Sequence, residues 1–323
     1  MKNNAESTMI PAASDHSGAA VAPDSLDKKR RRRRLTVTCI LIVLFTCGLL
    51  INESDYMGRS HTTVFQYLEV YSAFLPLLIY IVPFGIFIKR MGTKYEMGNL
   101  ELLTAVFCGA FIPAALAGEM NGGFDDLMKS LMGSAYSDAW IGSLEAGIVE
   151  ELLKLAATAM LLYVLNRTSL KHYLMIGMCV GMGFQIEEDI SYITESGFKN
   201  VNDAFPTALD RISGALGSHW AYAVVTAAGL YLIVRACGKN HIRKGIGWIV
   251  FVMADHFLYD TPLGEPALFN AILTAAVVLP VVIFLRSPEM TDDEAGRELP
   301  LENGEMKHDD QETGSRTTRG SHT

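Results

Sequence analysis

The sequence is poor in charge and lacks several short motifs that would assign it to a common class. Only 19% of its residues are charged, against roughly 25% in average soluble proteins. No CxxC pair occurs among its 5 cysteines, so neither a disulfide framework nor a thiolate zinc site is indicated. The zinc-binding motif HExxH is also absent, so any metal site has to be assembled from separate segments.

What the chain has instead is hydrophobic residues, which make up 50% of it. They gather in runs of the length that a bilayer requires, about 20 residues. We therefore predict an all-α polytopic membrane protein with about eight transmembrane helices. The predicted spans are 35–51, 67–88, 97–117, 140–165, 173–195, 209–235, 246–262 and 266–286.

Polar segments flank this region and divide the chain into three parts. Residues 1–34 form a predicted disordered tail that ends in a basic block, 35–286 form the multi-span domain, and 287–323 form an acidic disordered tail. No A-x-A-like cleavage site follows the basic block, which favours a retained anchor helix over a signal peptide. The block's position beside a span accounts for its charge, so we predict no nucleic-acid partner.

Basic residues in the connections predict an orientation. If the amino terminus is cytoplasmic, the inner connections hold nine basic residues: Lys89, Arg90, Lys94, Arg167, Lys171, Arg235, Lys239, Arg243 and Lys244. The outer connections hold only Arg59, Lys129 and Lys199. This is the positive-inside bias of a membrane protein. We therefore predict a multi-pass protein of the cell membrane, with both termini cytoplasmic.

Four of the predicted spans carry ionisable side chains, which cost several kcal/mol each in hydrocarbon and persist mainly where they are paired or functional. These side chains are Glu150, Glu151 and Lys154, then Glu187, Glu188 and Asp189, then His219, and finally His256 and Asp260. At 1.5 Å per residue, the spans place them at similar depth in the outer half of the bilayer. Four helices that pool carboxylates and imidazoles predict a buried catalytic or metal centre.

Helical spacing indicates which of these side chains share a face. Lys154 follows Glu150 by four residues and Glu151 by three, so its ammonium can neutralise one of the two carboxylates. His256 and Asp260 are likewise four residues apart, and an aspartate there can fix the tautomer of the imidazole.

At these positions the sequence resembles a known family. Residues 150–154 are EExxK, 181–188 fit GxGFxxxE, and Arg211 precedes His219 and the HxxxD segment 256–260. These motifs, in this order, resemble the PrsW family of intramembrane proteases, which is distantly similar to the CAAX-type prenyl-protein proteases. The resemblance covers about residues 70–286, and Asp189 stands where the family pattern usually has asparagine.

The resemblance implies proteolysis of a membrane-embedded protein substrate, in some members an anti-sigma factor, and the lipid bilayer as surroundings. Two mechanisms suit the residues. In one, zinc is held by Glu188, His219 and His256, and Glu150 or Glu151 accepts a proton from water. In the other, no metal takes part: a buried glutamate activates water, with His256 and Asp260 near the developing oxyanion. Three supporting residues are predicted: Lys154, Phe184 and Arg211.

Other classes of membrane protein fit less well. A rhomboid-type serine protease needs a GxSG-like nucleophile, and a presenilin-like aspartyl protease needs a GxGD motif; neither motif occurs. A metal or proton transporter is the strongest rival, because buried Glu and His also serve relays. Transporters more often show an internal repeat, and we find none. A membrane scaffold or prenyl-binding protein without catalysis is a further alternative.

Overall fold

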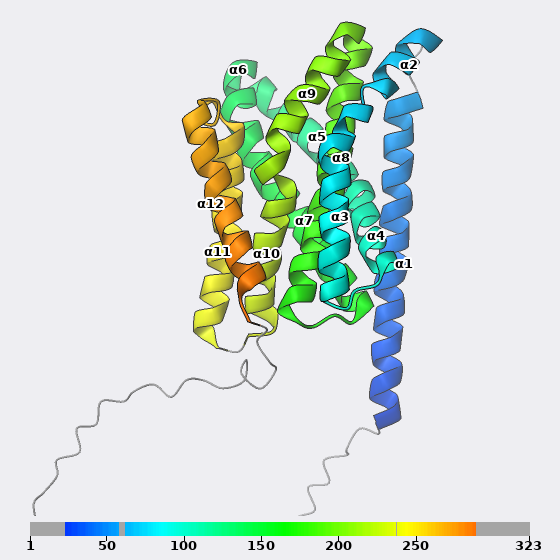
Figure 1. Cartoon of the computed structure of the whole chain (residues 1–323), viewed down its shortest axis with the longest axis vertical. Coiled ribbons are helices and arrows are strands. Elements are labelled where there is room, and N and C mark those ends of the chain that lie inside the picture. Colours follow the sequence, from blue (N-terminus) through cyan, green and yellow to red (C-terminus); the bar gives the residue numbers. More distant parts are fainter. Residues whose placement is uncertain (1–22, 58–61, 237, 289–323) are drawn as a thin grey trace, which may run out of the picture.

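The computed structural model describes residues 23–57, 62–236 and 238–288, and the regular elements in that part of the chain are helices (Figure 1). The α-helices are α1 (Pro23–Met57), α2 (Val64–Ser72), α3 (Leu78–Lys94), α4 (Asn99–Gly109), α5 (Ala115–Met132), α6 (Ser134–Tyr136), α7 (Gly142–Leu165), α8 (Leu170–Lys199), α9 (Ala204–Gly214), α10 (His219–Val234), α11 (Lys239–Asp260) and α12 (Ala267–Arg286). Short 3-10 or π-helical turns join them: η1 (Leu75–Leu77), η2 (Ala110–Ala114), η3 (Ser137–Ile141), η4 (Val201–Asp203) and η5 (Ala215–Gly217).

Within the described residues, 5 helical stretches are long and apolar enough to cross a membrane. They are Asp27–Glu53, Val64–Lys94, Asn99–Met132, Val201–Val234 and Ala267–Arg286. The predicted all-helical membrane architecture is therefore confirmed in its coarse form. The other predicted spans, 140–165, 173–195 and 246–262, coincide with α7, α8 and α11. These helices are long enough, but charged side chains lower their hydropathy.

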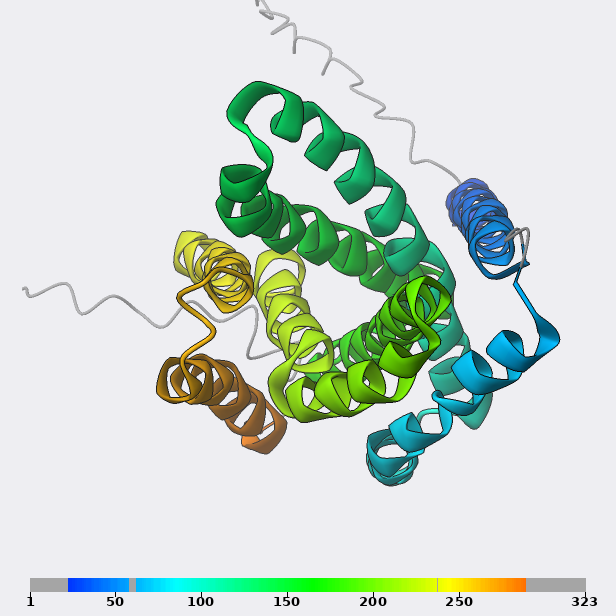
Figure 2. The same ribbon diagram turned by 90° about the horizontal axis from the view of Figure 1, so that it is seen from above.

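The bundle is built around α8, which packs against α4, α7 and α10, while α10 also packs against α11. Seen from above, α1, α3 and α12 lie at the periphery (Figure 2). Their apolar side chains are largely exposed, as expected for helices that face lipid rather than water. The buried polar side chains belong mainly to α7, α8, α10 and α11. The arrangement therefore keeps the costly groups inside and the apolar ones outside.

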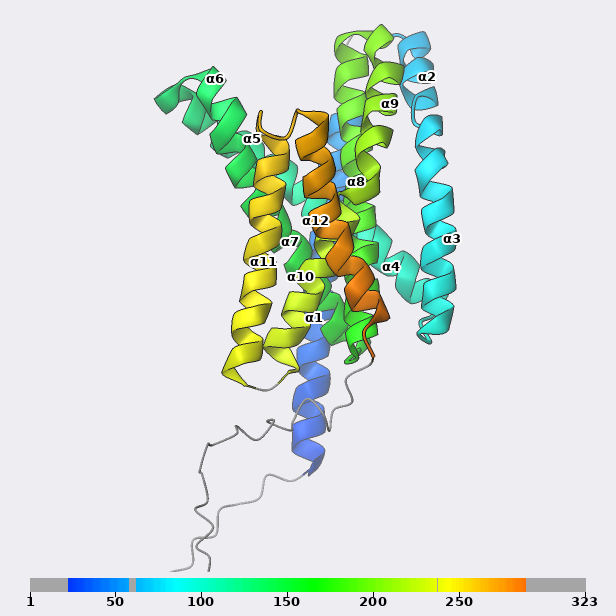
Figure 3. The same ribbon diagram turned by 60° about the vertical axis from the view of Figure 1, so that its left-hand side comes forward.

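The predicted inner connections all lie at one end of the bundle, with the start of α1 and the end of α12 (Figures 1 and 3). One difference from the sequence analysis concerns α1, which begins at Pro23 and takes in the basic block that we assigned to the tail. Lysine and arginine have high helix propensity, so the helix continues beyond the apolar run. Residues 1–22 and 289–323, the remainder of the predicted tails, lie outside the described residues.

Local sequence signals explain several helix ends. The Ser169 side chain accepts a hydrogen bond from His172 N and begins α8, as a serine N-cap does. α7 ends at Asn166, whose φ of 56° and ψ of 41° are left-handed, a conformation that asparagine tolerates. Pro113 lies in the π-helical turn η2 between α4 and α5, because its ring cannot continue a regular helix.

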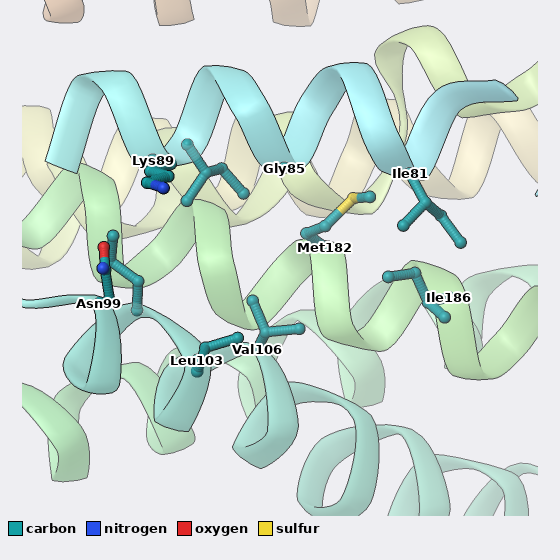
Figure 4. A pocket seen from close by; sticks show the side chains of 10 residues that line it. Ile81, Gly85, Lys89, Asn99, Leu103, Val106, Met182 and Ile186 are labelled. Carbon is teal, nitrogen blue, oxygen red and sulfur yellow. The ribbon is translucent and has the colours of Figure 1, made fainter. Parts of the chain in front are cut away.

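An apolar cleft of about 390 Å³ opens between α3, α4 and α8. Figure 4 shows Lys89 and Asn99 at one end of it and Ile81 and Ile186 at the other. Its walls between these ends are aliphatic or thioether side chains, such as Val106 and Met182. The cleft holds no cluster of ionisable groups, so the predicted chemistry lies elsewhere.

Close packing around α8 depends on glycine. A Cβ added at Gly183 would overlap the main-chain oxygen of Val106 on α4, and one added at Gly181 would overlap that of His219 on α10. Small residues allow such close approach of membrane helices. Because the backbone is the obstacle, a small shift of a side chain cannot relieve the overlap.

We expect Gly183→Ala to lower the stability of the folded protein by about 1–3 kcal/mol, the usual cost of overpacking. The measurement is the midpoint of thermal unfolding in detergent. Gly118→Ala, on α5 with no atom within 4 Å of the new Cβ, serves as the matched control. It should be neutral or stabilising by up to about 1 kcal/mol. Equal midpoints for the two variants would contradict this packing.

Candidate functional site

A polar cavity of about 780 Å³ lies between the helices that carry the buried charges. Its walls come from α5, α7, α8, α9, α10, α11 and α12. Asp260 and Glu265 are exposed at its rim, at the end opposite the basic connections. The cavity therefore joins the interior of the bundle to the more acidic of its two ends. Figure 3 shows α5 and α6 leaning away from the other helices at this end.

α7 contributes a buried cation and two carboxylates from one helical face. Lys154 Nζ lies 2.6 Å from Glu151 Oε1 and 3.8 Å from Glu150 Oε2. All three side chains are buried. The ammonium also lies 4.2 Å from the centre of the Phe184 ring, a cation–π contact. The structure thus brings together the predicted EExxK residues and the predicted supporting phenylalanine.

α11 presents His256 with one ring nitrogen toward each of two carboxylates. Nδ1 lies 3.1 Å from Glu151 Oε1, and Nε2 lies 3.2 Å from Asp260 Oδ2. Tyr222 of α10 stacks on the imidazole with ring centres 4.9 Å apart. Asp260 is the most accessible member of this group, with its side chain 35% exposed. It therefore connects a buried imidazole to the rim of the cavity.

His219 begins α10 and lies between a carboxylate and an ammonium. Its Nε2 lies 2.9 Å from Glu188 Oε2 on α8, and its Nδ1 accepts a hydrogen bond of 2.9 Å from Lys154 Nζ. Since the ammonium can only donate, this network selects the tautomer with hydrogen on Nε2.

Arg211 of α9 neutralises two neighbouring carboxylates of α8, Glu188 and Asp189. Its guanidinium donates to Glu188 and, over 2.6 Å, to Asp189 Oδ1. Asp189 is fully buried and also accepts a hydrogen bond of 2.7 Å from the Tyr80 hydroxyl on α3. Asp189, where the family pattern has asparagine, therefore links three helices and does not line the cavity.

Glu187 points away from this group. Its Oε1 accepts hydrogen bonds of 2.9 Å from Asn52 Nδ2 and 3.0 Å from the Tyr56 hydroxyl, both on α1. Adjacent residues of a helix differ by about 100° in direction, so only one of two neighbouring carboxylates can face the cavity. Here that residue is Glu188.

Three side chains converge closely enough to share a metal ion. Glu150, His219 and His256 each offer one ligand atom, and these atoms lie within 4.8 Å of one another. The predicted ligand set had Glu188 in place of Glu150. Glu188 Oε2 is instead engaged by Arg211 and by His219 Nε2, the ring nitrogen that faces away from the group.

The donor set fits a metal ion on two grounds, although a bound ion would replace the Lys154 ammonium at His219 Nδ1. Glu150 Oε2 is buried and has no hydrogen-bond partner in the described part of the chain. It lies 3.8 Å from His219 Nδ1 and 3.8 Å from His256 Nε2. The opposite nitrogen of each ring is held by a carboxylate, Glu188 or Glu151. Metal-binding histidines typically donate their second N–H to a carboxylate in this way.

Sequence reasoning missed two residues that touch this group. Asn121 of α5 donates a hydrogen bond of 3.2 Å to Glu150 Oε1. It lies beyond the predicted span 97–117, because α5 continues to Met132. Tyr222 also lines the cavity. Its position three residues after His219 on one helix was the signal that could have identified it.

Comparison with known proteins identifies a family. Residues 99–285 match the PrsW family of intramembrane metalloproteases. The match begins at α4, so α1, α2 and α3 lie before it. Searches of curated proteins and of solved structures return no match. The family match covers more than half of the chain and confirms the resemblance in its sequence motifs. The chain belongs to the PrsW family of intramembrane metalloproteases, and is thus a hydrolase that acts on peptide bonds.

Proposed function

We propose that the chain cleaves a membrane-associated protein in the polar cavity, with zinc held by Glu150, His219 and His256. One observation carries the proposal: three buried side chains from three helices converge within 4.8 Å, and both imidazoles are oriented from behind by carboxylates. Nitrogen and oxygen ligands with an open fourth position are typical of catalytic zinc. When bound, the ion activates water and polarises the scissile carbonyl.

The other residues have roles that follow from their contacts. Glu151 and Glu188 fix the orientation of His256 and His219. Lys154 balances the negative charge of the two α7 carboxylates. Asp260, next to His256 and partly exposed, is the group that can exchange a proton with water at the rim. Asn121 holds one oxygen of Glu150 and so keeps the other oxygen directed at the two imidazoles.

A metal-independent mechanism remains as the alternative route to the same reaction. It is supported by Lys154, because its ammonium donates a hydrogen bond of 2.9 Å to His219 Nδ1. This is the nitrogen atom that would otherwise bind the zinc. Here Glu150 Oε2 takes the proton from the attacking water. His256, with Asp260 beside it, stabilises the negative charge that develops on the carbonyl oxygen. The two mechanisms use the same cavity and differ in whether a metal is required.

The arrangement also supports a membrane topology. We propose about eight passes, in which α7, α8 and α11 cross the bilayer because their charges are buried against one another. The basic end then faces the cytoplasm, with both termini there, and the cavity opens into the outer half of the cell membrane. A substrate would be a membrane-embedded protein of the anti-sigma-factor kind, entering sideways from the lipid.

The first prediction concerns the three proposed ligands. Glu150→Gln, His219→Ala and His256→Ala should each reduce cleavage of a membrane-protein substrate by more than the roughly 100-fold that loss of an outer-shell partner costs. The measurement is the rate of product formation by purified protein reconstituted in vesicles. Glu195→Gln is a matched control, because Glu195 is on α8 but exposed and paired with Lys199. Full activity in any two of the three variants would reject the site.

The second prediction separates the two mechanisms. Phenanthroline should inactivate the wild-type protein, and added zinc should restore it. Elemental analysis should find about one zinc per chain, as a single three-ligand site requires, and much less in His219→Ala and His256→Ala. Unchanged activity in a metal-free preparation would reject the metal and favour the glutamate mechanism.

A third prediction tests whether Glu150 or Glu188 is the carboxylate ligand. At saturating zinc, Glu188→Gln should still bind about one zinc per chain, as the wild type does. Its affinity for zinc should be roughly 10- to 100-fold lower, as expected when a residue that orients a histidine ligand is lost. Glu150→Gln should fail to reach full occupancy. Titration with zinc, read by calorimetry, distinguishes the two, and the reverse result would restore Glu188 as the ligand. The thermal unfolding curve of each variant checks that it is folded.

A further inference from the structure

A second pocket, lined by both arginine and apolar side chains, lies at the basic end of the bundle, opposite the cavity. Its volume is about 460 Å³, and it is lined by parts of α1, α7, α8 and α10 and by the turn between α7 and α8. Four arginines contribute to it: Arg30, Arg34, Arg167 and Arg235. Among its lining residues, all within the described part of the chain, none is acidic.

Arg167 and Arg34 differ in how fully their hydrogen-bond donors are satisfied. Arg167 is neutralised by a bidentate contact with Glu101, which lies outside the pocket. Arg34 donates to the side-chain oxygen of Asn166, at the left-handed end of α7. Its Nε–H, however, is buried and has no hydrogen-bond partner among the described residues. A buried donor without a partner is costly, so this guanidinium is suited to an acceptor from outside the chain.

The pocket is also amphipathic. Above the arginines its wall is formed by apolar and aromatic side chains at helical spacing: Ala159, Leu162 and Tyr163 on α7, and Leu230 and Val234 on α10. Polar groups therefore lie at the end of the bundle, and apolar ones extend toward its middle. A soluble anion would use only the first part. A phosphate that carries an acyl chain would use both.

We propose that this pocket binds the phosphate of an anionic phospholipid from the leaflet at the basic end, with the acyl chain along α7 and α10. Basic pockets between membrane helices at the membrane surface suit such headgroups, and arginine is well matched to phosphate. Arg30 and Arg34 are one helical turn apart on α1, so both can contact one headgroup. The proposal does not depend on the proteolytic mechanism.

The basic block supplies a matched control within one turn of helix. Arg31 and Arg33 are exposed and do not line the pocket, so Arg31→Gln/Arg33→Gln removes the same charge as Arg30→Gln/Arg34→Gln. The assay is thermal unfolding of the full-length chain in detergent, titrated with dioctanoyl phosphatidylglycerol, with dioctanoyl phosphatidylcholine or with inorganic phosphate. Ligand binding to the folded state raises the unfolding midpoint.

Phosphatidylglycerol should raise the midpoint of the wild type saturably, while phosphatidylcholine and inorganic phosphate should not. Arg30→Gln/Arg34→Gln should bind about 30-fold more weakly, and Arg31→Gln/Arg33→Gln should change affinity less than about threefold. If the first double variant is unfolded in the absence of ligand, Arg30→Gln alone should still bind phosphatidylglycerol about fivefold more weakly than the wild type. Equal loss in both double variants would overturn the proposal, and so would an equal shift with phosphatidylcholine. An equal shift with inorganic phosphate would reject the lipid as the source of the phosphate.

Discussion

The compensation of buried charge is the constraint on which this structure depends. Glu151 and Lys154 are completely buried and lie 2.6 Å apart, and Glu188 is held between Arg211 and His219. Removing one partner of a buried pair leaves an uncompensated charge, which costs about 3–5 kcal/mol. Of the helices that carry the buried charges, α7, α8 and α11 are not among the stretches apolar enough to cross a membrane by themselves. Together, α7, α8, α9, α10 and α11 satisfy one another's polar groups, so their charged side chains are compensated only when the helices are packed together.

This constraint explains why α8 occupies the middle of the bundle. Glycine on two of its faces lets α4 and α10 approach to backbone contact, while its carboxylates face three directions. Glu187 contacts α1, Glu188 contacts α9 and α10, and Asp189 contacts α3 and α9. A run of three acids therefore ties peripheral helices to the centre, and only one of the three faces the cavity. Glu188 thus lines the cavity, while its neighbours Glu187 and Asp189 hold other helices against α8.

Much of the fold was predictable, since hydropathy and connecting charge locate most of the helices, and helical spacing pairs Lys154 with the α7 carboxylates. The choice between Glu150 and Glu188 as the third converging group was not. It depends on the rotation of α7 and α8 about their axes, because one residue changes the direction of a side chain by about 100°. Asn121 was missed because α5 continues to Met132, beyond residue 117 where the apolar run ends. Sequence spacing fixes contacts within a helix, whereas contacts between helices require packing.

The amino-terminal helix α1 precedes the region matched to the family. It contacts the bundle at two places, the α7–α8 turn and the carboxylate run of α8. Near its start Arg34 binds Asn166 at the α7–α8 turn, and further along Asn52 binds Glu187, beside Glu188. These two contacts are 18 residues apart, or roughly 27 Å along a helix. One continuous helix therefore contacts both the end of α7 and the carboxylate run of α8. Because Glu150, Glu151 and Lys154 are on α7, and Glu188 is on α8, α1 contacts both helices that carry these groups. An anionic lipid at Arg34 would add a further contact beside the α7–α8 turn, since it would accept a hydrogen bond from the buried Nε–H of Arg34.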